Sequence, residues 1–146
     1  MAGSAFRAIL WGGLAAGVGD SLLALLLYRV APTLIYQSIA SGLLGREAYR
    51  GGLATAALGV LLHFSIATAW AALFTWVSLK QPVLARRTLA SGLAFGVVVY
   101  LFMKYVVLPL SAVVRLTPFE PLAMVGHAFL VGLPIAFFAR RPALPA

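Results

Sequence analysis

Four long apolar segments, each interrupted by one ionisable residue, constrain the fold of this chain more than any other feature. The segments cover residues 6–28, 52–79, 88–108 and 118–139. A helix needs about 20 mostly apolar residues to cross the hydrocarbon core of a bilayer. We therefore predict an all-α, polytopic membrane protein whose four transmembrane helices form a single domain over residues 1–146.

The composition supports a membrane location. Of the 146 residues, 63% are hydrophobic and 10% are charged, whereas a water-soluble chain of this length needs a more polar surface. The net charge of +8 comes from basic residues that flank the apolar segments instead of forming one stripe, so lipid headgroups are the expected partner and nucleic acid is not. The chain has no cysteine, which excludes disulfides and cysteine metal sites.

The connection between the first two segments is too apolar for a solvated loop. Ile35, Ile39, Leu43 and Leu44 recur at helical spacing over this stretch. We expect a short interfacial helix that lies on the outer face of the membrane, with a re-entrant hairpin as the alternative.

The start of the fourth segment has the spacing of a helix N-terminus. Thr117 and Glu120 are separated as in a capping box, and Pro118 would occupy the first helical position. This pattern predicts that Glu120 is a structural cap instead of a ligand-binding residue.

The distribution of basic residues indicates the orientation. With four spans, both termini and the middle connection share one side, which carries six basic residues against four on the other. The positive-inside rule then places both termini in the cytoplasm. The first set is Arg7, Lys80, Arg86, Arg87, Arg140 and Arg141, and the second is Arg29, Arg46, Arg50 and Arg115.

Pairs of small residues four positions apart mark three of the apolar segments. Small residues let helix backbones approach closely in lipid. Their spacing is compatible with packing inside one subunit and with contact between two copies, and the sequence does not separate the two. The pairs are Gly13 and Gly17, Thr55 and Gly59, and Gly92 and Gly96.

The four ionisable residues inside the segments are Asp20, His63, Lys104 and His127. At 1.5 Å per residue their depths agree to within about 6 Å, so we expect one polar layer in the outer half of the bilayer, with Tyr100 one turn from the lysine. In such a layer Asp20 could pair with Lys104 or with a protonated histidine, leaving an imidazole for a ligand or a proton. The alternatives are a lysine that extends to the interface and histidines that only join helices.

Enzyme chemistry finds little support in the sequence. The chain has three carboxylates, and it lacks paired acids, a His-x-x-x-His spacing, a phosphate-binding glycine loop and a nucleophile elbow. We do not expect an enzyme, and we expect no metal site apart from the haem alternative below.

Three functions remain after these exclusions. The polar layer favours a small conduit or carrier for a proton, ion or small solute, functioning as a homo-oligomer because four helices form a narrow bundle. A non-catalytic accessory or assembly subunit of a membrane complex is the first alternative. A haem protein with His63 and His127 as axial ligands is the second.

The C-terminal third of the chain resembles the YagU-type inner-membrane proteins of bacteria, a family without an established biochemical activity. The resemblance lies in Gly92-Leu93, Pro109-Leu110, Thr117-Pro118, Glu120, Gly126-His127 and Arg140-Arg141. It implies a bacterial inner-membrane location and a role for His127. The first half of the chain departs from the family.

Overall fold

The computed structural model describes residues 2–113 and 116–140, and within these residues every regular element is a helix. Four of the helical segments are long and apolar enough to cross a membrane. Their bounds are Ser4–Tyr28, Gly52–Lys80, Thr88–Leu110 and Pro121–Ala139. The prediction of an all-α chain with four such segments is thus confirmed, and the observed bounds differ from the predicted ones by at most three residues.

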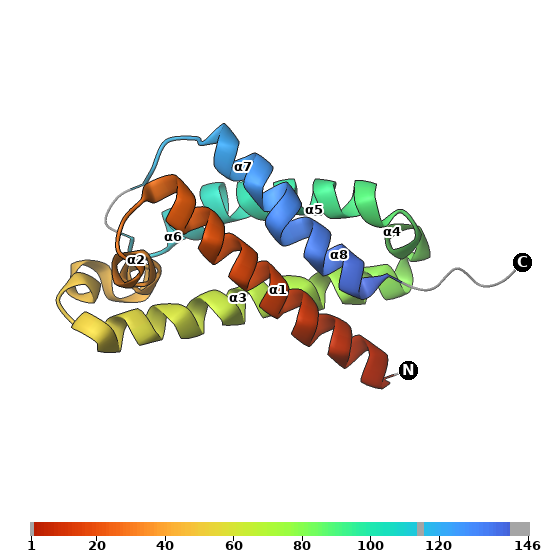
Figure 1. Cartoon of the computed structure of the whole chain (residues 1–146), viewed down its shortest axis with the longest axis horizontal. Coiled ribbons are helices and arrows are strands. Elements are labelled where there is room, and N and C mark those ends of the chain that lie inside the picture. The colour runs from red at the N-terminus through yellow and green to blue at the C-terminus, as the bar shows by residue number, and fades with distance from the viewer. Residues whose placement is uncertain (1, 114–115, 141–146) are drawn as a thin grey trace, which may run out of the picture.

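The elements follow one another with short connections (Figure 1). The first span is α1 (Ala2–Tyr28), and a connection of α2 (Pro32–Leu44) and the 3₁₀ turn η1 (Gly45–Tyr49) leads to the second span, α3 (Gly52–Lys80). The short α4 (Pro82–Arg86) precedes the third span, which consists of α5 (Thr88–Phe102), η2 (Met103–Val107) and α6 (Leu108–Leu110). The fourth span consists of α7 (Pro121–His127), η3 (Ala128–Gly132) and α8 (Leu133–Ala139).

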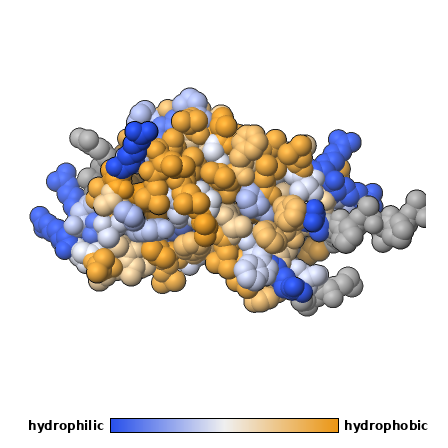
Figure 2. Space-filling view, viewed as in Figure 1, coloured by the Kyte–Doolittle hydropathy of each residue, from blue (hydrophilic) through white to orange (hydrophobic). Residues whose placement is uncertain are grey.

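The spans pack as a bundle in which α1 lies against α3 and α8, and α5 lies against α7, η3 and α8. The start of α1, the end of α8 and α4 lie at one end of the bundle, while α2 crosses the other end and is viewed almost along its axis in Figure 1. Hydrophobic residues cover the middle of the molecule and hydrophilic residues gather at its two ends (Figure 2). This surface suits a chain whose middle contacts lipid.

Two turns of π-helix interrupt the third and fourth spans, and each ends two residues before a proline. In η2 the Leu108 N–H donates to the carbonyl of Met103, five residues earlier. In η3 the Leu133 N–H donates to the carbonyl of Ala128. The ring of a proline inside a helix clashes with the carbonyl four residues earlier, and a widened turn relieves that clash. Pro109 and Pro134 therefore explain both irregular turns.

The capping box predicted for the fourth span is not formed. The helix begins at Pro121, and Glu120 before it has an extended backbone (φ −120°, ψ 95°) and no capping hydrogen bond from its side chain. The residue before a proline is disfavoured in the helical conformation, which favours a helix start at Pro121 with Glu120 outside the first turn. Its carboxylate accepts a hydrogen bond from the Tyr28 hydroxyl at 2.6 Å instead.

The connection between the first two spans contains the expected short helix, α2, but two of its polar residues face the protein. Gln37 and Ser41 are buried, and the Gln37 amide donates to the carbonyl of Gly52 at 3.0 Å. Leu43 and Leu44 are exposed at the far end of the helix. The face of α2 that docks on α3 is therefore mixed in polarity.

The small-residue pairs all lie where helices of this one chain meet. Gly13 and Gly17 face α3, Gly59 faces the backbone of α2 at Tyr36, and Gly92 and Gly96 face η3 and its neighbouring helices. The Thr55 hydroxyl donates to the carbonyl of Ala48 at 2.6 Å, which ties α3 to η1. The described contacts favour packing inside one subunit for these pairs.

Apart from Asp20 and Lys104, the described charged residues lie toward the two ends of the bundle. Among them, the end where α1 begins carries basic residues only, whereas the other end mixes basic and acidic ones. The first set is Arg7, Lys80, Arg86, Arg87 and Arg140, and the second is Arg29, Arg46, Glu47, Arg50 and Glu120. Arg115 and Arg141, which the sequence analysis also assigned to these sides, lie outside the described residues.

Candidate functional site

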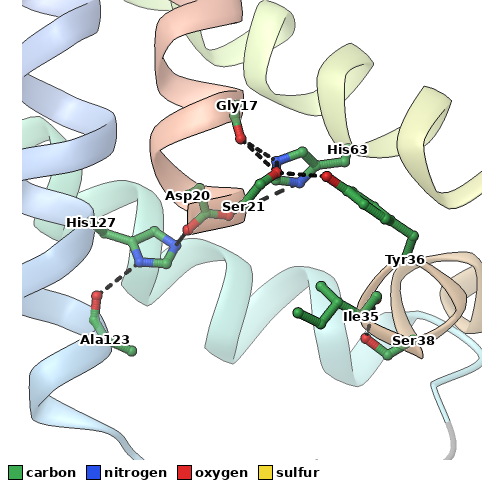
Figure 3. A network of polar contacts seen from close by, with 9 residues as sticks. All are labelled: Gly17, Asp20, Ser21, Ile35, Tyr36, Ser38, His63, Ala123 and His127. Atoms are coloured by element: carbon green, nitrogen blue, oxygen red, sulfur yellow. Dashed lines mark hydrogen bonds and ion pairs between the residues drawn. The ribbon is translucent and has the colours of Figure 1, made fainter. Parts of the chain in front are cut away.

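Asp20 lies between the two histidines of the chain, in the middle of the bundle (Figure 3). Its carboxylate oxygens are 3.3 Å from Nε2 of His127 and 4.0 Å from Nδ1 of His63. The histidine side chains are 18% and 12% exposed, and that of Asp20 is 29% exposed. We call these three residues, which come from α1, α3 and α7, the His–Asp–His triad.

The far nitrogen of His63 is fixed by α1. Nε2 of His63 lies 2.8 Å from the carbonyl oxygen of Gly17 and 3.2 Å from Oγ of Ser21. The Ser21 hydroxyl donates its own proton to the Gly17 carbonyl at 2.8 Å. A carbonyl can only accept, so Nε2 must carry the ring proton of His63. The nitrogen that faces Asp20, Nδ1, then has a lone pair when the ring is neutral.

His127 is fixed in the same way by its own helix. Its Nδ1 lies 2.8 Å from the carbonyl oxygen of Ala123, one turn earlier in α7, and must be the donor in that contact. Nε2 therefore faces Asp20 with a lone pair when the ring is neutral. The ring of Tyr100 packs on His127 with a centroid separation of 5.3 Å and holds the imidazole from the α5 side.

Because both imidazole N–H groups donate to backbone carbonyl oxygens, the neutral histidines have no N–H left to donate to Asp20. Neither neutral histidine can donate to Asp20 while it keeps its carbonyl contact, so an ionised Asp20 would face two lone pairs. One added proton, on Nε2 of His127 or on Asp20 itself, turns the 3.3 Å contact into a hydrogen bond, which is assisted by charge when the proton is on His127. The arrangement can therefore hold one exchangeable proton between Asp20 and His127.

The polar network extends to α2 through residues that the sequence analysis did not single out. The Tyr36 hydroxyl donates to Oγ of Ser21 at 3.0 Å, and its ring lies edge-on to His63. Ser21 follows Asp20 directly, and a serine beside an intramembrane acid is a signal that could have identified it. Tyr36 carries no such signal, because its place depends on how α2 folds back onto α3.

Lys104 does not join the triad, so the expected pairing of Asp20 with Lys104 is absent. Its Nζ donates to Oγ1 of Thr117 and to the carbonyl oxygen of Pro118, both at 2.5 Å, in the segment between α6 and α7. A similar depth brings two residues together only if their helices turn them toward each other, and the flexible lysine stem reaches away from the layer. Tyr100, by contrast, is buried beside His127, and its hydroxyl accepts the backbone N–H of Glu120 at 2.9 Å.

A cavity of about 160 Å³ lies beside the triad. Asp20, His63 and His127 form its polar wall, and apolar side chains form the rest. The apolar lining consists of Ala16, Ile39, Ile66, Ala67, Trp70, Val99, Met103 and Val131. Drug-sized ligands occupy pockets of about 300–1,000 Å³, so this cavity is small for a haem macrocycle, and haem binding by His63 and His127 stays an alternative hypothesis. In the described part of the chain, no three His, Asp or Glu residues are placed to hold a metal ion.

Comparisons with protein-family models, curated proteins and solved structures give no match for this chain. The resemblance of its C-terminal third to the YagU-type proteins therefore stays a prediction.

The hydrogen bonds predict opposite tautomers for the two histidines. At alkaline pH we expect His63 to carry its proton on Nε2 and His127 on Nδ1, because each donates to a fixed carbonyl oxygen. Nitrogen-15 spectra of histidine-labelled protein can distinguish the tautomers, and the chain contains two histidines, so His63→Gln and His127→Gln assign the signals. The same tautomer at both residues would contradict this arrangement of donors.

Proposed function

We propose that this chain is a small membrane carrier that takes up and releases a proton at the His–Asp–His triad. The observation that supports the proposal is the position of the Asp20 carboxylate between two imidazoles, each of which has its other nitrogen on a backbone carbonyl oxygen. Ionisable residues inside transmembrane segments are costly, and they are the usual components of proton paths.

The polar contacts of the triad run across the bundle and not along it, which favours a carrier over a continuous conduit. The contacts run from α7 through α1 to α3 and α2, so they cross the bundle instead of connecting its two ends. A single transverse site needs a change of access from one side to the other, as carriers provide. We also propose that the chain resides in a bacterial inner membrane as a homo-oligomer, with the basic end and both termini in the cytoplasm.

Proton movement into liposomes tests this proposal. Vesicles containing the purified protein, an internal pH-sensitive dye and an imposed diffusion potential should acidify faster than vesicles without protein. Asp20→Asn keeps the shape of the side chain but removes the titrating carboxyl, so the protein-dependent rate should fall at least about tenfold. Glu47→Gln is the matched control, since Glu47 is exposed and paired with Arg50 at 3.0 Å.

The test compares the acidification rates of the Asp20→Asn and Glu47→Gln variants. The control should acidify at the wild-type rate. Equal rates for the wild type and Asp20→Asn would count against a proton-carrying triad.

The accessory-subunit alternative has one observation in its favour. Polar contacts join neighbouring helices at several levels, including Gln37 with Gly52 and Tyr28 with Glu120. A polar layer could therefore serve helix pairing alone, as the polar contacts between membrane helices often do. A combined stability and flux measurement, argued in the Discussion, separates the two functions.

A further inference from the structure

We infer that the cavity beside the triad binds a small organic cation with a primary ammonium group, in exchange for the proton. This inference rests on the proposed function and names the substrate class of the same site. It follows from three properties of the cavity: its size, its hydrogen-bonding groups and its charge.

The size of the cavity limits the ligand to about eight non-hydrogen atoms. An engineered apolar cavity of about 150 Å³ takes up benzene, and the cavity here measures about 160 Å³. Most of its wall is apolar, so the body of the ligand should be hydrocarbon. Trp70 supplies an aromatic surface, which attracts a cation as well as an apolar group.

The polar wall offers acceptors and no free donor. The donors of both imidazoles are used by the carbonyls of Gly17 and Ala123. The acceptors that remain in this wall of the cavity are Nδ1 of His63, Nε2 of His127 and the Asp20 carboxylate. A ketone, an ester or a carboxylate cannot pair with such a set, whereas a primary ammonium has three N–H donors for these three acceptors.

The charge of the site selects an ammonium over a hydroxyl compound. With both histidines neutral, the ionised Asp20 leaves one negative charge in a site largely shielded from water, where an unpaired charge is costly. A primary ammonium balances that charge, and an alcohol does not. Inorganic cations prefer several oxygen ligands, and the apolar wall provides none beyond the carboxylate.

Proton and ammonium then compete for the same acceptors. The free site holds one proton between Asp20 and His127 and is neutral. When the ammonium enters, its N–H groups replace that proton, which leaves to water, and the site remains neutral. Each bound cation therefore displaces one proton from the site, so the ammonium should compete with the proton that the carrier takes up.

Calorimetric titration of the purified full-length chain in micelles with benzylammonium tests the inference. Binding should saturate, and titrations in buffers of different ionisation enthalpy should report the release of about one proton per cation bound. Benzyl alcohol has the same shape without the charge and should bind at least about tenfold more weakly. Asp20→Asn should abolish binding, and Glu47→Gln should leave it unchanged.

A second variant locates the ligand without altering the triad. Ile39 reaches the cavity from α2, and Ile39→Phe should fill part of the cavity and weaken the binding of benzylammonium at least about tenfold. Undiminished binding by Ile39→Phe, equal binding of benzyl alcohol, or no binding of benzylammonium to the wild type would each overturn the inference. Proton flux that depends on Asp20 without ammonium binding overturns this inference alone, whereas ammonium binding without such flux overturns only the proposed function.

Discussion

Gly96→Ala should lower the free energy of unfolding of the bundle by about 3 kcal/mol, although it adds a single methyl group. A Cβ at position 96 would lie 2.3 Å from the carbonyl oxygen of His127 and 2.5 Å from Cα of Ala128. Both are backbone atoms, so no side chain can swing away, and α5 must separate from η3. The separation would also move His127 away from Asp20.

Gly12→Ala is the matched control for this substitution. Gly12 is also buried in a span, but an added Cβ would meet its nearest neighbours at 3.5 to 3.7 Å, which is ordinary contact. Alanine is the better helix former, so Gly12→Ala should be neutral or slightly stabilising. Unfolding in mixed detergent micelles gives the stabilities, and the nitrogen-15 signals of His127 should change in Gly96→Ala alone. Equal stabilities would show that the helices do not touch at Gly96.

The limits of the spans are predictable from the sequence because local chemistry determines them. Apolar runs are bounded by Arg and Pro, and those runs became the four long helices. The common depth of Asp20, His63 and His127 is also a local property, since it follows from the rise per residue along each helix. These three residues do meet in the structure.

The partners of Lys104 and Tyr36 depend on contacts between distant segments, which spacing along the chain does not encode. Lys104 has the depth of the triad but pairs with Thr117 and Pro118. Tyr36 enters the network because α2 folds against α3, and the apolar pattern of α2 indicated only that a helix would form. In both cases, the sequence does not specify the direction in which the side chain points around the axis of its helix.

The π-helical turns were detectable in the sequence, since each has a local cause. Pro134 lies inside the fourth apolar segment, where a regular helix would place its ring against the carbonyl of Leu130. In the structure that carbonyl approaches α1 so closely that a Cβ on Gly19 would lie 2.5 Å from it. Pro134 in the fourth span and Gly19 in the first thus both contribute to this close contact just beyond His127. Turns of π-helix are frequent at functional sites.

Replacing the whole triad by leucine should abolish proton movement while the bundle stays about as stable as the wild type. A buried charged group can often be exchanged for apolar residues of similar volume without loss of stability. Removing one member is different: His127→Leu leaves Asp20 with its more distant partner, His63 at 4.0 Å, and should cost about 3 kcal/mol. The triple variant Asp20→Leu, His63→Leu, His127→Leu leaves no buried charged side chain that has lost its partner.

The other polar groups of the network keep their partners in the triple variant, which makes the comparison interpretable. Ser21 still donates to the carbonyl of Gly17, and Tyr36 still donates to Ser21. Detergent unfolding and liposome acidification are then measured on the wild type, His127→Leu and the triple variant. A stable triple variant without proton flux assigns the triad to function, because helix pairing has survived its loss. A triple variant less stable than His127→Leu would instead mean that the triad holds the helices together, as an accessory subunit requires.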